Sequence, residues 1–79
     1  MNIEKEGDIM TNTELLEKKI DESGYKRSYL ANAIGLKSRQ ALANKIKNES
    51  EFTATEINAL CDLLKIESLE EKDSIFFTQ

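Results

Sequence analysis

Six cationic side chains lie between Ser23 and Asn48, a stretch of the sequence that contains no Asp or Glu. The protein as a whole is acidic, with 11 Lys and Arg against 15 Asp and Glu. Outside this stretch there are therefore 5 bases and 15 acids, a net charge of −10. A single surface cation is ordinarily just a solvated group. Six cations without an intervening carboxylate are better suited to binding an anion.

Side chains that could read nucleobases lie in the same stretch. A guanidinium matches O6 and N7 of guanine, a carboxamide matches N6 and N7 of adenine, and a small apolar group can meet a thymine methyl. We therefore predict that base edges of DNA are contacted by Arg39, Gln40, Ala43 and Asn44, although a turn-facing polar role is an equal alternative for Asn44. Contacts to the DNA backbone are predicted for Lys26, Arg27, Ser28, Lys37, Ser38, Lys45 and Lys47.

Two short helices joined by a turn are predicted to position these side chains. The apolar spacing indicates helices over roughly 27–34 and 39–47. Gly35 can adopt the left-handed conformation that a helix end commonly needs, and the small Ala31 allows the two helices to cross closely. Ser38 is a suitable N-cap for the second helix.

Three further helices are predicted from capping boxes, in which Ser or Thr is followed three residues later by Glu. The boxes are Thr11 with Glu14, Thr53 with Glu56, and Ser68 with Glu71. The sequence contains no alternating pattern long enough for a strand. It therefore predicts an all-α, compact fold of five helices, with a helix-turn-helix formed by helices 2 and 3.

Apolar positions predict which faces of these helices are buried. The first helix is expected to begin near Asn12, to end at Gly24, and to direct inward Leu15, Leu16 and Ile20. The fourth should bury Ile57, Leu60, Cys61 and Leu64, which have the i, i+3, i+4, i+7 spacing of a core face. Cys61 is then a small core hydrophobe. Tyr25 is expected to pack, whereas packing and base stacking are equal alternatives for Tyr29.

The length of 79 residues indicates one domain, which we place at residues 11–79 after a flexible segment at residues 1–10. Near the end of the domain, Ile75, Phe76 and Phe77 cannot all point inward from one helix. One aromatic ring should close the core, and a dimer contact is an equal alternative for the rest.

Several classes of function are disfavoured by composition. The chain has no His and one Cys, so no zinc site, other cofactor site or disulfide within the chain is predicted. No nucleophile stands with a base and no glycine-rich loop is suited to phosphates, so we do not expect an enzyme. No apolar run approaches the roughly 20 residues that span a bilayer, and the amino terminus does not resemble a signal peptide. A cytoplasmic protein without a membrane partner is expected.

Three segments resemble the phage Cro/CI repressor family, also called lambda-repressor-like or XRE-like, and in particular small regulators of Gram-positive phages and prophages. They are residues 24–36 (GYKRSYLANAIGL), residues 38–46 (SRQALANKI), and residues 51–57 (EFTATEI) together with residues 75–77 (IFF). The sequence departs from the family pattern at Lys37, an apparent insertion after the turn glycine, and at Lys26, where a Ser or Thr cap is common. The resemblance implies a homodimer that binds a double-stranded DNA operator, with one recognition helix in each half-site.

Two functions are consistent with these observations. The first is a sequence-specific DNA-binding transcriptional regulator, a phage or prophage repressor that reads a major groove with the helix starting near Arg39. The second is a helix-turn-helix fold used for protein recognition, such as an antirepressor. The acidic remainder of the chain would suit a basic protein partner, and the fold alone does not dictate the ligand.

Overall fold

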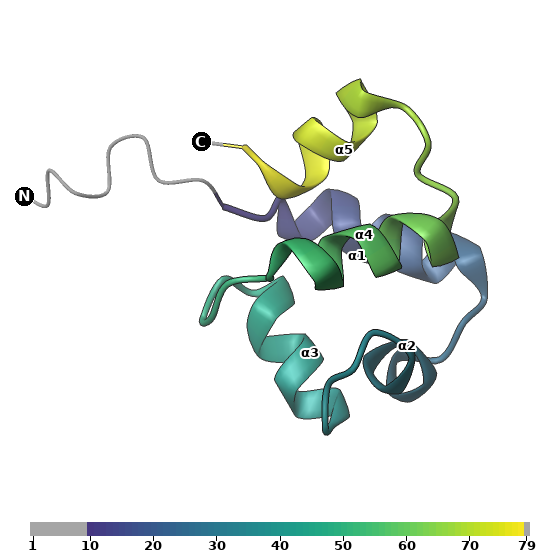
Figure 1. The fold of residues 1–79 in the computed structure, drawn as a ribbon, viewed down its shortest axis with the longest axis vertical. Helices are drawn as coiled ribbons and strands as arrows, with labels where there is room; N and C mark the ends of the chain where they lie inside the picture. The colour runs from purple at the N-terminus through teal and green to yellow at the C-terminus, as the bar shows by residue number, and fades with distance from the viewer. Residues whose placement is uncertain (1–9, 79) are drawn as a thin grey trace, which may run out of the picture.

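A computed structural model describes residues 10–78 as five helices (Figure 1). They are α1 (Thr13–Ser23), α2 (Arg27–Ala33), α3 (Arg39–Ile46), α4 (Ala54–Leu64) and α5 (Leu69–Phe76). No strand occurs among these residues; the one β feature is an isolated antiparallel bridge between Met10 and Thr78. The predicted all-α fold is confirmed for this part of the chain. Most of the segment expected to be flexible, residues 1–9, lies outside the described residues.

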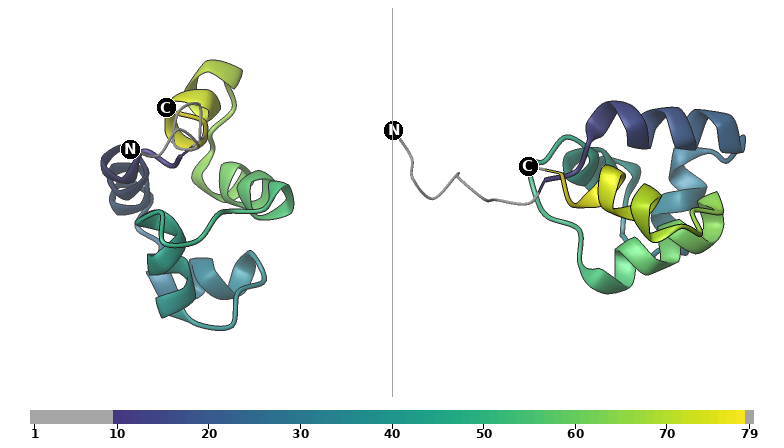
Figure 2. Two further views of the ribbon diagram at one scale, coloured as in Figure 1. Left: turned by 90° about the vertical axis from the view of Figure 1, so that its left-hand side faces the viewer. Right: turned by 90° about the horizontal axis from the view of Figure 1, so that it is seen from above.

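The helices lie at three levels along the long axis of the molecule. In Figure 1 and in the left view of Figure 2, α2 and α3 lie at one end and α5 lies at the other, with α1 and α4 between them. Helix α2 packs most closely against α3, as a helix-turn-helix requires. The cationic stretch therefore lies at one end of the bundle.

One apolar core joins all five helices. Its largest completely buried side chains are Leu16 and Ile20 of α1, Leu30 of α2, Leu42 and Ile46 of α3, Leu60 of α4, and Ile75 of α5. Phe76 is also buried, and its ring packs edge-on against Phe52 with a centroid distance of 5.6 Å. Phe77 is exposed, so the prediction that one aromatic ring closes the core is confirmed.

Two predicted glycine terminators are confirmed by the backbone. Gly24 ends α1 with φ of 80°, and Gly35 lies in the turn after α2 with φ of 94°. Leu36 then donates its N–H to the carbonyl of Ala31, which closes the turn and returns the chain toward the core. A glycine is favoured at both positions because L side chains rarely adopt a positive φ.

The start of α1 differs from the prediction. Asn12 caps the helix by accepting a hydrogen bond from the N–H of Leu15, so the expected capping box of Thr11 with Glu14 is wrong. Leu15 itself is 38% exposed and does not join the core. Thr11 is buried, and both polar groups of its backbone bind the side chain of Asn48.

Candidate nucleic-acid interface

Helix α3 presents one buried and one exposed face. Leu42 and Ile46 point into the core, and this orientation leaves Arg39 and Gln40 exposed at the start of the helix. Ser38 caps the helix by accepting a hydrogen bond from the N–H of Ala41 at 3.1 Å, as the sequence predicted. Arg39 is the first helical residue, as predicted, and Lys37 lies in the turn before it.

The carboxamides of Gln40 and Asn44 form a pair on α3. Nε2 of Gln40 donates a hydrogen bond to Oδ1 of Asn44 at 2.9 Å, as residues four apart on a helix can do. Asn44 and Ala43 are half-buried, whereas Gln40 is exposed. The bond leaves Oε1 of Gln40 and Nδ2 of Asn44 unused by the pair, an acceptor and a donor of the types that adenine N6 and N7 complement.

A second cluster of the predicted residues surrounds a hollow beside the start of α2. The hollow has a volume of about 260 Å³ and is lined by Tyr25, Lys26, Arg27, Ser28 and Arg39. Three of these five side chains are cationic. Arg39 therefore lies beside the predicted backbone contacts as well as at the start of α3.

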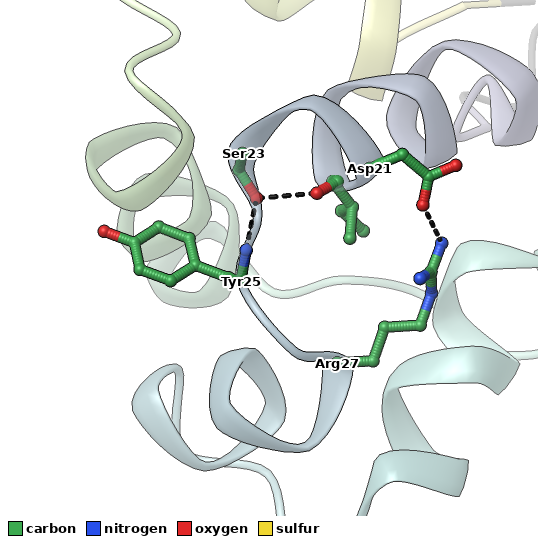
Figure 3. A network of polar contacts seen from close by, with 5 residues as sticks. Asp21, Ser23, Tyr25 and Arg27 are labelled. Atoms are coloured by element: carbon green, nitrogen blue, oxygen red, sulfur yellow. Dashed lines mark hydrogen bonds and ion pairs between the residues drawn. The ribbon is translucent and has the colours of Figure 1, made fainter.

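Arg27 is only partly available to an anion. Its guanidinium forms an ion pair with the carboxylate of Asp21 at 3.1 Å (Figure 3). In the same network the hydroxyl of Ser23 donates to the carbonyl of Ile20 and accepts from the N–H of Tyr25. These contacts fix the short connection between α1 and α2. A phosphate near Arg27 would have to compete with Asp21.

The side chain of Lys45, for which a contact to the DNA backbone is predicted, binds groups within the domain. Its Nζ lies 3.1 Å from Oε1 of Glu56 and donates to the carbonyl of Glu51 at 2.7 Å. The side chains of Lys45 and Glu56 are only 15% and 14% exposed. Glu56 comes after the cation-rich stretch, so the local charge pattern could not reveal this ion pair.

Glu56 has two roles at this junction. It completes the predicted capping box with Thr53 at the start of α4, and it also binds Lys45. Burial alone would raise the pKa of the Glu56 carboxyl, but hydrogen bonds from the Thr53 N–H and from Lys45 outweigh it, so the pKa lies below its ordinary value. The carboxylate is therefore ionised at neutral pH.

The remaining predicted residues are exposed. Lys26, Ser28, Lys37, Ser38 and Lys47 all lie on the surface of the α2–α3 end. Tyr25 and Tyr29 are also exposed there, and their rings stack on each other with centroids 5.3 Å apart. The structure thus brings together Lys26, Arg27, Ser28 and Arg39 around one hollow, and Gln40 with Asn44 on α3. Lys45 is bound internally, and Lys47 lies at the C-terminal end of α3.

Among residues 10–78, no group of His, Cys, Asp and Glu could hold a metal ion, and no helix is long and apolar enough to cross a membrane. Cys61 is buried, and burial raises the pKa of its thiol, as expected for a core residue. Comparisons with protein-family models, curated proteins and solved structures find no match to this chain.

Proposed function

We propose that this protein is a sequence-specific DNA-binding transcriptional regulator that inserts α3 into the major groove. The observation that carries the proposal is the combination of exposed Arg39, Gln40 and Lys47 with an acid-free chain from residue 24 to residue 48. Arg39 and the Gln40–Asn44 pair supply base-reading groups at one end of the bundle. Lys26, Lys37 and Lys47 supply phosphate contacts around them.

A regulator of this kind would act by occupying a promoter. In the simplest arrangement two copies bind a palindromic operator, one α3 to each half-site. Two-fold binding is part of the proposal because an eight-residue recognition helix reads only a few base pairs. Repression by steric exclusion then needs no ligand and no catalytic group.

In vitro selection from a random duplex pool tests the proposal directly. We expect enrichment of a palindromic consensus, whose half-site spacing reports the distance between the two α3 helices. Retention on random duplex should fall steeply as salt rises. A pool that is not enriched, together with no retention on duplex at low salt, would contradict the proposal.

A protein-binding function is the second candidate, and a hollow between α1 and α5 favours it. This hollow has a volume of about 460 Å³, is lined partly by Leu15 and Ile75, and is bordered by Lys18, Glu22 and Glu70. Of the two helices that line it, α5 lies at the end of the bundle away from α2 and α3 (Figures 1 and 2). A purified partner that binds with random duplex absent, and that Leu15→Glu releases, would support this function.

A further inference from the structure

The C-terminal end of α3 is cross-linked to the rest of the domain by polar side chains. We propose that Lys45 and Asn48 are positioning residues that set the direction in which Arg39 and Gln40 project. This inference rests on the DNA-binding function proposed above. It assigns to Lys45 a role different from the phosphate contact expected of a cation in this stretch.

Lys45 links α3 to the start of α4. One ammonium group binds both the Glu51 carbonyl at 2.7 Å and the Glu56 carboxylate at 3.1 Å. Glu56 is in turn held by the N–H of Thr53 at 3.0 Å. The ammonium, the carboxylate and the capping box therefore form one continuous set of directional bonds, and charge-assisted bonds of this kind are the stronger ones.

Asn48 links the end of α3 to the segment before α1. Its Oδ1 accepts from the N–H of Thr11 and its Nδ2 donates to the carbonyl of Thr11, both at 2.8 Å. The adjacent Thr13 hydroxyl donates to the carbonyl of Ile46 at 2.6 Å. The N–H of Asn12 then binds the carbonyl of Ile75 at 2.6 Å, so this segment is itself fixed to α5.

The N-terminal half of α3 lacks such links. Within residues 10–78, the side-chain hydrogen bonds of this half are the Ser38 cap and the Gln40–Asn44 pair, and both stay within the helix and its own cap. Apolar packing of Leu42 and the close packing of α2 hold this half of α3 in place, but such packing is less directional than a hydrogen bond. The orientation of the base-reading end therefore depends also on the bonds at the other end, and small displacements of a recognition group weaken binding.

The matched pair Lys45→Met and Lys47→Met separates positioning from charge neutralisation. Each substitution removes one cation and keeps an unbranched side chain. Of these two lysines, only Lys45 has a polar partner for its side chain among the described residues. Lys47 is exposed. Binding is measured by fluorescence anisotropy on the selected duplex and on a random duplex, over a range of salt, at a temperature at which circular dichroism finds every variant folded.

For Lys45→Met we expect binding to the selected duplex to weaken roughly tenfold, the equivalent of one lost base contact. Binding to random duplex and the salt slope should stay at the parent values. Lys47→Met should instead weaken binding to both duplexes alike and make the salt slope about 0.9 less steep. Asn48→Gly, which keeps the backbone at a positive φ and removes the amide, should behave like Lys45→Met.

The inference is overturned if Lys45→Met lowers the salt slope as Lys47→Met does, or if it leaves discrimination between the duplexes unchanged. If the parent protein binds neither duplex, the proposed function fails. A double-mutant cycle of Lys45→Met with Glu56→Gln, measured by unfolding in urea, then still tests the cross-link between Lys45 and Glu56. A coupling of about fivefold in the unfolding equilibrium constant would support it, and additive effects would overturn it.

Discussion

The salt dependence of DNA binding can be worked out from the cations that the structure leaves available. Lys26, Lys37, Arg39 and Lys47 lie on the α2–α3 end without a carboxylate partner among residues 10–78. If all four neutralise phosphates, the slope of log K against log salt is about −3.6 per chain, so binding weakens roughly 150-fold between about 50 and 200 mM salt. This change corresponds to about 3 kcal/mol of binding free energy.

Smaller and larger slopes would identify which cations take part. With Arg39 on a base edge and three lysines on phosphates, the slope is about −2.7 and the loss roughly 40-fold over the same range. If Arg27 and Lys45 also left their carboxylates to bind phosphates, the slope would be about −5.4 and the loss roughly 1,800-fold. Anisotropy titrations on a labelled duplex, analysed per bound chain, distinguish these cases. A slope near zero would refute the assignment of this surface to DNA.

Three further predictions concern single residues. Arg39→Ala should weaken binding to the selected duplex by about 1–3 kcal/mol and relax the preference at one base pair, measured by repeating the selection with the variant. Gly35→Ala should lower the free energy of unfolding by about 1 kcal/mol in urea, because φ is +94° although nothing lies within 4 Å of an added Cβ; Gly35→Asn should cost less. Because the folded-state pKa of Glu56 is lowered from 4.5, its contribution to stability is fully present above about pH 5. That contribution is lost as pH falls through the folded-state pKa of Glu56. Glu56→Gln should therefore make the unfolding free energy less dependent on pH in this range. An unchanged pH dependence would contradict this role of Glu56.

The elements governed by local rules were predictable from the sequence. Ser38, Thr53 and Ser68 all cap helices by the short-range hydrogen bonds that their spacing indicates. The glycines that end α1 and the α2 turn follow from backbone sterics alone. The buried face of α4 follows from helical periodicity, and its four predicted residues are all in the core.

The errors arise where a distant residue competes with a local rule. Thr11 is of a residue type that is common at N-caps, but its backbone is bound by the side chain of Asn48, which is 37 residues away in the sequence. Asn12 takes the cap instead, and Leu15 is left half-exposed. Lys45 also forms its ion pair with a residue of another helix, Glu56 of α4. Sequence spacing carries no signal for such pairs, because it does not say which loops and helices lie side by side.

The separation of charge also bears on how specificity would arise. The acid-free stretch from residue 24 to residue 48 contains α2 and α3. The rest of the protein carries a net charge of −10. DNA would repel those parts and attract only the α2–α3 end, which limits the orientations in which the protein can bind. With a total charge of −4, non-specific binding gains little from charge beyond this one face. In the proposed function, discrimination would then depend on hydrogen bonds from α3 to base edges, and hence on the bonds of Lys45 and Asn48 that we propose fix its direction.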